Sequence, residues 1–322
     1  MRYRIVLWLI AGALGLISFR AAAQDSDALA DLERDFVAAI ANAKDATVAI
    51  HLGDGTGSGV IVSPDGLILS VAHVTGSSGQ RAAVYFADGS VAVAETLGLE
   101  PGTDCGMLRL LAPGPWPFAE LVAPDAPPDE DQTAPASGTP VVALGHPGGF
   151  NPERPVHARF GRVLDVDDQA SGGDGTLRTD AALTAGDSGG PLLDRGGRIL
   201  AIHTRVGPRL DQNYHVPVAR FLEQWTKLLE GGVAPATLGV VGRDALTGFA
   251  VGAVEPGSAA QRAGLTRGDV IVGFNGVAIG TPPNGRSLRS FLALRRPGDP
   301  VELRVLRRGQ AMNLTVTLDA PE

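Results

Sequence analysis

The strongest constraint on the fold is a long series of short apolar runs separated by turn residues, which extends over residues 46–218. Examples are Thr47–Ile50, Gly59–Val62 and Val141–Leu144, each bounded by Gly, Asp or Pro. Brief apolar runs between turn signals are typical of β-strands, and many of them in succession indicate a barrel or a sandwich. The chain also has 43 glycines, 23 prolines and only 5% aromatic residues, which favours turns over long helices. The sequence therefore predicts a mainly β fold.

Helical patterns flank this β-rich region on both sides. Within residues 24–45, four apolar residues recur at helical spacing and predict an amphipathic lead-in helix: Leu29, Leu32, Phe36 and Ile40. A second helix is expected over Ala219–Glu230, because Gly231 and Gly232 follow it directly. The first domain is accordingly placed at residues 46–230, with a proline-rich surface connection over residues 112–139.

Residues 236–320 show a different, mixed pattern that predicts a small α+β domain. The expected strands and helices of this domain follow one another as strand Phe249–Val254, helix Ser258–Ala263, strand Asp269–Phe274, helix Ser287–Leu294, and strands Pro300–Leu306 and Ala311–Leu318.

The N-terminal 23 residues have the features of a secretory signal peptide. Arg2 and Arg4 precede an apolar run, Ile5–Phe19, and the small residues Ala21–Ala23 follow it. This run is shorter than the roughly 20 residues that a membrane-spanning helix needs. We expect export and cleavage after Ala23, which places the protein in the periplasm. The alternative is a retained segment that anchors the protein in the inner membrane, facing the periplasm.

Composition excludes several classes of function. The formal net charge of −8 argues against nucleic acid as a partner, because such binding depends on clustered Lys and Arg. The single cysteine, Cys105, cannot form an intramolecular disulfide, and a small buried apolar role is the simplest interpretation of it. The six histidines do not have the spacing of a metal motif. No metal or cofactor is expected.

A serine lies among glycines in the segment TDAALTAGDSGGPL, residues 179–192. A nucleophilic serine needs backbone N–H groups that point to the place where an oxyanion forms, and glycines leave that place uncrowded. Here Ser188 would be the nucleophile, and the amides of Gly186 and Ser188 would be the donors. An ordinary glycine-rich hairpin turn explains the same string equally well when it is considered alone.

Two upstream residues decide between these interpretations. His73 follows an apolar strand pattern, and Asp104 opens another. Each alone is more simply structural, because histidines at strand ends and aspartates in turns are common. Together with Ser188, however, they occur in the order His, Asp, Ser, which is the chain order of the chymotrypsin-type triad.

The sequence motifs around these three residues make the match to a known protease family more specific. The segments GSGVIVSPDGLILSVAHV (57–74), TDCGMLRL (103–110), VVALGHPGG (141–149) and TDAALTAGDSGGPL (179–192) resemble the HtrA (Deg) family of trypsin-like serine proteases. The resemblance implies a chymotrypsin-like double β-barrel with the site between the barrels. It also implies His73 as general base, Asp104 as its orienting carboxylate and Ser188 as nucleophile.

The chain also departs from the family pattern. Asp187 stands where the family commonly has asparagine. Two histidines outside the triad, His146 and His157, are expected at the surface or in loops. The candidates for the walls of the substrate pocket, several of them polar, are Ala182, His203, Thr204, Arg205, Tyr214 and His215.

The words TLGV (237–240), GLTRGDVI (264–271) and FNG (274–276) resemble a bacterial PDZ domain. In such domains an extended peptide adds to a sheet edge, and backbone amides of a glycine-containing loop bind its terminal carboxylate. The resemblance implies Leu238, Gly239 and Val240 as that loop, with Phe291 or Leu292 of the predicted helix lining an apolar pocket. Leu-Gly-Val is also common in ordinary strands.

Two functions are therefore compared. The first is a secreted or periplasmic serine endopeptidase that hydrolyses unfolded or damaged envelope proteins, with a PDZ domain that binds exposed C-termini. The second is a proteolytically idle peptide-binding scaffold or holding chaperone. The resemblance further implies a homotrimer, although Phe36 is the only aromatic residue of the lead-in helix.

Overall fold

The computed structural model describes residues 29–122, 135–154, 156–166, 175–232, 236–280, 287–292 and 295–320. The predicted signal peptide, residues 1–23, lies outside these ranges. In the part of the chain that is described, no helix combines the length and the apolar character needed to cross a bilayer.

The first closed barrel has the strand order β1-β2-β3-β6-β5-β4. Its strands are β1 (Thr47–Leu52), β2 (Gly55–Ile61), β3 (Leu67–Val71), β4 (Arg81–Tyr85), β5 (Val91–Glu100) and β6 (Cys105–Leu110). All five residues of β3 are buried, because this strand lies in the interior between the two barrels. A short helix, α2 (Ala72–Thr75), follows β3, and a 3-10 turn, η1 (Pro101–Thr103), precedes β6.

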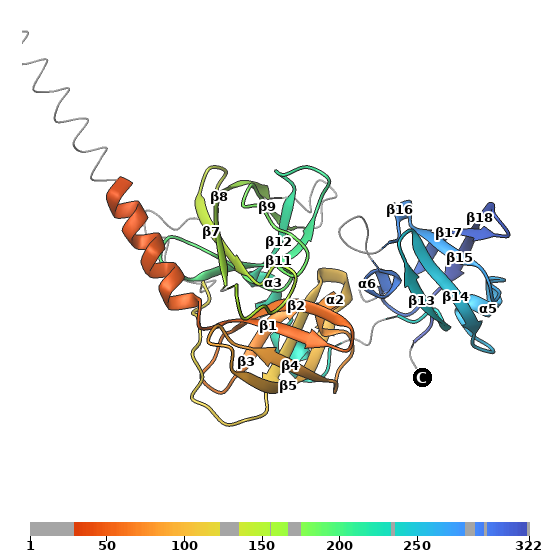
Figure 1. The fold of residues 1–322 in the computed structure, drawn as a ribbon, viewed down its shortest axis with the longest axis horizontal. Helices are drawn as coiled ribbons and strands as arrows, with labels where there is room; N and C mark the ends of the chain where they lie inside the picture. Colours follow the sequence, from red (N-terminus) through yellow and green to blue (C-terminus); the bar gives the residue numbers. More distant parts are fainter. Residues whose placement is uncertain are drawn as a thin grey trace, which may run out of the picture.

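The second closed barrel has the order β10-β11-β12-β9-β8-β7 (Figure 1). Its strands are β7 (Pro140–Gly145), β8 (His157–Val166), β9 (Leu177–Thr179), β10 (Pro191–Leu193), β11 (Ile199–Val206) and β12 (Asn213–Pro217). Apolar residues of both barrels form one continuous core, which includes Ile50 and Leu69 from the first barrel and Leu144 and Ile202 from the second. The predicted double β-barrel is confirmed.

Helices cover the outside of the barrels. The N-terminal helix spans residues 29–43, and its Phe36 ring packs edge-on against Phe160 of β8 with 5.3 Å between ring centroids. The single helix predicted over Ala219–Glu230 is instead two short helices, α3 (Val218–Glu223) and α4 (Trp225–Leu229). The chain breaks at Gln224 because α3 packs on β11 and β12 of the second barrel, whereas α4 packs on β5 and β6 of the first.

A third sheet, with the order β13-β14-β15-β17-β18 and β16 paired to β15, forms the C-terminal part. Its elements are β13 (Val240–Ala245), β14 (Gly248–Val254), α5 (Ala259–Arg262), β15 (Val270–Phe274), β16 (Val277–Ala278), α6 (Leu288–Leu292), β17 (Pro300–Arg307) and β18 (Gln310–Thr317). The predicted small α+β domain is confirmed as a PDZ fold. Because β13 pairs only with β14 among the described strands, it is an edge strand of this sheet.

A buried carboxylate joins this sheet to the barrels. Glu100 at the end of β5 has no exposed surface, and its side chain accepts hydrogen bonds from Lys227 of α4 and from Arg296. Burial opposes ionisation of Glu100, but the hydrogen bonds from Lys227 and Arg296 outweigh it and lower the pKa of the carboxyl. Nearby, α6 contacts α2, the helix that carries His73.

Candidate active site

Neighbouring strands of the first barrel bring His73 and Asp104 together. Val71 pairs with Cys105 across β3 and β6, so His73 and Asp104, which lie just beyond this pair, face each other. His73 Nδ1 lies 3.0 Å from Asp104 Oδ2 and 3.1 Å from Oδ1, and the backbone amide of His73 donates to Oδ1 at 3.2 Å. A carboxylate can only accept, so Nδ1 carries the proton and Nε2 is left as the basic nitrogen.

Thr204 of β11 connects this pair to the second barrel. Its Oγ1 donates a hydrogen bond to Asp104 Oδ2, and its carbonyl accepts one from Ser188 Oγ at 3.2 Å. A β-bulge between His203 and Arg205 leaves Thr204 out of the ladder, which frees it for both contacts. Thr204 was predicted only as a pocket wall. Its buried side chain instead holds the carboxylate beside His73.

Ser188 is half-buried and is fixed from both barrels. Its carbonyl accepts from the Ser58 amide of β2 at 2.8 Å, and the next residue, Gly189, donates to the carbonyl of His203 in β11 at 2.8 Å. In the described part of the chain the Ser188 hydroxyl donates to Thr204, not to His73. A rotation about its Cα–Cβ bond would be needed to turn the hydroxyl toward the imidazole.

The loop before Ser188 presents backbone donors. Gly186 has φ +96°, and an added Cβ would lie 2.5 Å from the Gly148 amide nitrogen, so only glycine fits here. Its carbonyl accepts from Ser58 Oγ at 2.8 Å, and Ser58 Oγ in turn accepts from the His146 amide at 2.9 Å. Among the described residues, the amides of Gly186 and Ser188 have no acceptor.

Ser58 is a functional residue that the sequence analysis missed. Its side chain is fully buried and uses both its donor and its acceptor capacity to fix the loop. The only sequence signal is its place in the Gly-Ser-Gly word before His73.

His203 and His215, predicted as pocket walls, form a fully buried pair instead. His203 Nε2 lies 3.1 Å from the Leu144 carbonyl, so it carries a proton, and His203 Nδ1 must therefore accept. His215 Nδ1 donates to it at 2.9 Å, which leaves His215 Nε2 to accept from Thr179 Oγ1 at 2.8 Å. These contacts fix both tautomers.

The other pocket candidates keep some exposure. Ala182 is exposed, and Arg205 and Tyr214 are half-buried, with the Arg205 guanidinium carbon 4.3 Å from the centroid of the Tyr214 ring. Such a cation–π contact holds both side chains at the surface of β11 and β12. These three residues stay candidates for the pocket wall.

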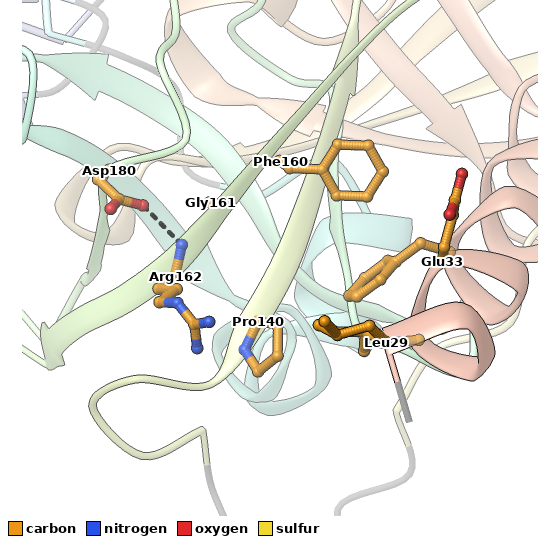
Figure 2. A pocket seen from close by; sticks show the side chains of 9 residues that line it. Leu29, Glu33, Pro140, Phe160, Gly161, Arg162 and Asp180 are labelled. Atoms are coloured by element: carbon orange, nitrogen blue, oxygen red, sulfur yellow. Dashed lines mark hydrogen bonds between the residues drawn. The ribbon is translucent and has the colours of Figure 1, made fainter. Parts of the chain in front are cut away.

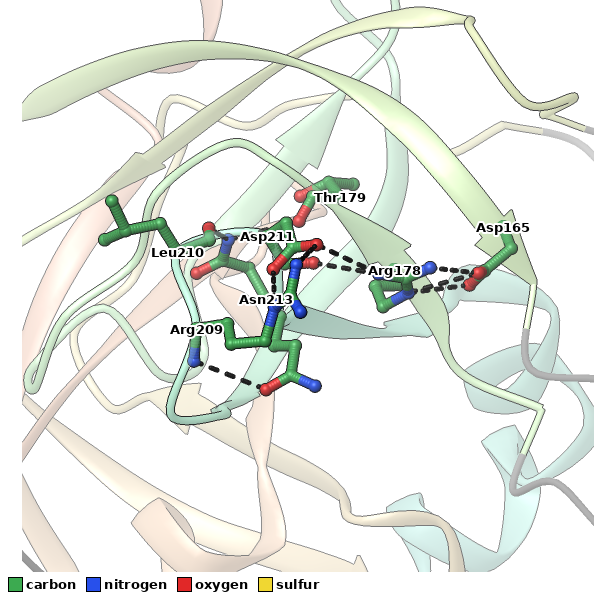
Figure 3. A network of polar contacts seen from close by, with 8 residues as sticks. Asp165, Arg178, Thr179, Arg209, Leu210, Asp211 and Asn213 are labelled. Carbon is green, nitrogen blue, oxygen red and sulfur yellow. Dashed lines mark hydrogen bonds and ion pairs between the residues drawn. The ribbon is translucent and has the colours of Figure 1, made fainter.

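A network of polar contacts supports the loop between β11 and β12 (Figure 3). Asn213 donates to the carbonyls of Thr179 at 3.1 Å and Leu210 at 2.7 Å, and its side-chain oxygen accepts from the Leu183 amide at 3.0 Å. Arg178 extends from β9 to Asp165 and to the Asp211 carbonyl, as Figure 3 shows. The sequence analysis did not identify Asn213, whose partners are far apart in the chain.

Two further expectations concern single buried residues. His146 was expected at the surface or in a loop; it lies in the loop after β7, but only 2% of it is exposed, and its Nε2 lies 3.3 Å from the Thr47 carbonyl of the first barrel. Burial lowers the pKa of His146. Cys105 is fully buried, as the sequence predicts, and burial raises the pKa of its thiol.

In the PDZ sheet, the Leu238–Val240 segment leads into the edge strand β13. The Gly239 amide donates to Thr237 Oγ1 at 3.3 Å, and its carbonyl accepts from the Glu255 amide at 3.0 Å. Leu238 is buried in the same apolar cluster as Phe291 of α6. The predicted helix over Ser287–Leu294 corresponds to α6, although residues 293–294 lie outside the described ranges.

A separate apolar pocket lies between the N-terminal helix and the second barrel (Figure 2). Leu29 and Phe36 of the helix face Pro140 and Phe160 across it. None of the triad candidates lines this pocket. Within the described ranges, no three His, Cys, Asp or Glu side chains gather as they would around a metal ion.

Two family models match the chain. A trypsin-like peptidase domain matches residues 57–202, and a PDZ domain matches residues 251–307. A probable periplasmic serine endoprotease, DegP-like, of Marinomonas sp. is 30% identical over 284 residues, which cover 82% of this chain and 57% of the relative. The chain belongs to the HtrA family of trypsin-like serine proteases.

Other HtrA relatives agree with this assignment. The periplasmic pH-dependent serine endoprotease DegQ of Escherichia coli is 29% identical over 290 residues, covering 83% of this chain and 60% of that protein. The chain thus spans little more than half the length of these curated relatives. The solved structure of an HtrA-type protease, AlgW with a tripeptide, is 25% identical with a TM-score of 0.51 and covers 88% of this chain and 96% of that one. A serine endoprotease from Yersinia pestis shares the fold at 24% identity, with a TM-score of 0.51 and coverage of 88% and 97%.

Proposed function

We propose that this HtrA-type chain is a serine endopeptidase in which Ser188 is the nucleophile, His73 the general base and Asp104 its orienting carboxylate. One observation carries the proposal. Asp104 binds His73 Nδ1 on one side and Thr204 on the other, and the carbonyl of Thr204 accepts the hydroxyl of Ser188. The three groups of a triad are thus held within one chain of contacts.

The chemistry follows from these contacts. The Ser188 hydroxyl turns from Thr204 to His73 Nε2, and its oxygen attacks the carbonyl carbon of the peptide while the proton passes to the imidazole. The amides of Gly186 and Ser188 stabilise the negative oxygen of the tetrahedral intermediate. The C–N bond then breaks, and His73 gives the proton to the leaving amine. Water, activated by the same imidazole, hydrolyses the acyl-enzyme and frees the serine.

Asp104 contributes by holding His73 in the productive tautomer. It also stabilises the imidazolium that forms during attack. Thr204 and the His73 amide occupy further lone pairs of the carboxylate, which keeps its orientation fixed.

We assign the PDZ sheet to the binding of polypeptide C-termini. An extended peptide would add to the edge of β13, and the amides of Leu238, Gly239 and Val240 would bind its carboxylate, with the Gly239 amide giving up its 3.3 Å contact with Thr237 Oγ1. Substrates would be unfolded or damaged envelope proteins, because addition to a strand edge needs an extended chain. The proposed location is the periplasm, with the N-terminal segment either cleaved or retained as an inner-membrane anchor.

We also propose a homotrimer, with the apolar surface beside the N-terminal helix as its contact. Leu29 and Phe160 are 67% and 59% exposed there. Exposed apolar side chains that lie together in this way mark surfaces that contact another protein. Sedimentation of the purified protein tests this. A mass of one chain would refute it.

The second candidate function is an idle scaffold or holding chaperone. The observation that favours it is the Ser188 hydroxyl, which is bound to Thr204 instead of His73. The two candidates differ in the reactivity of this hydroxyl.

A fluorophosphonate probe and reduced casein distinguish the candidates. The endopeptidase should react covalently with the probe at Ser188 and should cleave casein. Ser188→Ala should abolish both, whereas the matched control Ser90→Ala, an exposed serine in the turn between β4 and β5, should change neither. Equal cleavage by the wild type and Ser188→Ala would refute the proposed nucleophile. A wild type that neither reacts nor cleaves, yet prevents casein aggregation, would support the scaffold.

A further inference from the structure

A fully buried carboxylate lies between the two proposed oxyanion donors. Asp187 separates Gly186 from Ser188 in the chain, and its side chain has no exposed surface. Its Oδ2 accepts from the Thr184 amide at 2.8 Å and lies 3.0 Å from Nη1 of Arg159. Arg159 belongs to β8, on the far side of β7 from the nucleophile loop.

The barrel provides space for this carboxylate. Gly145 at the end of β7 lies against it, and a Cβ on this glycine would be 2.6 Å from Asp187 Oδ1. Oδ1 has no hydrogen-bond donor among the described residues. The pair with Arg159 is therefore the main compensation for the buried negative charge.

Burial makes that compensation necessary. An isolated carboxylate in an apolar interior is strongly disfavoured, and removal of one partner of a buried ion pair leaves the other charge uncompensated. Burial raises the pKa of Asp187, while the guanidinium of Arg159 and the Thr184 amide act in the opposite direction. Arg159 retains contact with water, with 21% of its side chain exposed, whereas Asp187 has none.

We infer that Arg159 is a positioning residue for the oxyanion hole, acting through its ion pair with Asp187. This inference rests on the proposed endopeptidase function. The peptide groups on either side of Asp187 connect Gly186 to Ser188, so the direction of both amides depends on where the Asp187 side chain is held. Without Arg159, the carboxylate gains by turning toward water. That rotation moves the two donors away from their common point.

A purely structural role predicts something different. If Arg159 only stabilised the barrel, its loss would lower the melting temperature but would leave the kcat of the folded protein unchanged. A positioning role predicts a loss of kcat with little change in KM, because the oxyanion exists only in the transition state.

The test uses Arg159→Met, which keeps the length of the side chain and removes its charge. With a fluorogenic peptide built on a casein cleavage site, we expect kcat to fall about 100- to 1000-fold, the range for loss of one oxyanion donor, and KM to change less than about threefold. The rate of fluorophosphonate labelling should fall in parallel. The matched control is Arg162→Met, an exposed arginine of the same strand, which should leave both rates unchanged.

If Arg159 acts by compensating the charge of Asp187, the effects of substituting the two residues should not be additive. Asp187→Asn removes the buried charge, so adding Arg159→Met to it should lower kcat less than about threefold further. This non-additivity is the expected signature of a direct pair. If Arg159→Met alone does not fold, the same double variant decides the matter, because it must fold and cleave if compensation is the role of Arg159.

The possible results distinguish failure of the proposed endopeptidase function from failure of the role assigned to Arg159. A wild type that neither labels nor cleaves refutes the proposed function and, with it, this inference. An active wild type with an equally active Arg159→Met refutes the inference alone. Equal losses of kcat from Arg159→Met in the wild type and in the Asp187→Asn background would also overturn it.

Discussion

The buried pair of His203 and His215 makes the protease fold sensitive to acid, and this sensitivity can be measured. Burial lowers the pKa of His203 to about 3, against the partly offsetting hydrogen bond to Leu144. Burial, and then the neighbouring His203, lower the pKa of His215 well below 6.5. A proton added to His203 Nδ1 would face the N–H of His215, so the folded state resists the charge that the unfolded chain accepts readily.

The sign and size of the effect follow from linkage. Well above pH 6.5 both imidazoles are neutral in both states, and the stability from this source is fully present. As pH falls from 6.5 toward 3, the unfolded chain binds protons that the folded chain does not, and stability is lost. His203 contributes about 1.4 kcal/mol per pH unit, and His215 acts in the same direction. Between pH 5.5 and 4 the free energy of unfolding should therefore fall by about 2 kcal/mol from His203 alone, a substantial part of the usual total for a domain.

Urea unfolding at a series of pH values measures this loss. The Ser188→Ala background prevents self-digestion, and the fluorescence of Trp116 and Trp225 reports on the barrels, because residues 236–320 contain no tryptophan. His203→Gln, which keeps a donor for the Leu144 carbonyl, should reduce the slope by about 1.4 kcal/mol per pH unit. If this variant has the same slope as its parent, the reasoning is refuted, because the buried imidazole would not be the group that resists protonation.

Three further predictions concern other buried polar groups. Ser58→Ala should lower kcat about tenfold and the free energy of unfolding by about 1–3 kcal/mol, because it leaves the Gly186 carbonyl and the His146 amide without a partner. Kinetics and urea unfolding check both effects. Cys105 should not react with iodoacetamide until urea unfolds the chain, and rapid labelling of the native protein would contradict its burial. Arg296→Ala should weaken the contact of the PDZ sheet with Glu100, seen as faster elastase cleavage between the domains in the Ser188→Ala background, because residues 228–242 contain small apolar residues but no Lys or Arg. An unchanged cleavage rate would show that the Arg296–Glu100 pair does not hold the PDZ sheet against the barrels.

Local patterns located strands in both barrels and in the PDZ sheet. Each run that was interpreted as a strand lies on a strand of the structure, with ends that differ by at most two residues, except that Gly59–Val62 begins four residues after the start of β2. The helix over Ala219–Glu230 failed for a non-local reason. Its two halves pack on different barrels, and nothing in the sequence of Gln224 signals the change of direction.

The site residues could be predicted from the sequence where they belong to a recognisable motif. They could not be predicted where their position depends on the register between paired strands. His73, Asp104 and Ser188 were identified by their order and their flanking words, and the structure holds them in one chain of contacts. His203 and His215 were assigned to the pocket because their segments resembled its walls. Their actual role follows from the pairing of β11 with β12, which places them opposite each other. That register depends on the whole barrel, and the two segments alone do not reveal it.

The contacts that Ser58 and Thr204 make between the barrels could not be predicted for a similar reason, because they depend on the tertiary structure. His73 and Asp104 come from the first barrel and Ser188 from the second, so the distance from base to nucleophile depends on how the barrels dock. Ser58 and Thr204 are the residues that tie each barrel to the other's catalytic group. A small displacement of reacting groups has a large effect on rate. Loss of these contacts should therefore lower kcat strongly, although neither residue reacts with substrate. Substitutions that alter kcat without touching substrate should therefore concentrate along this interface.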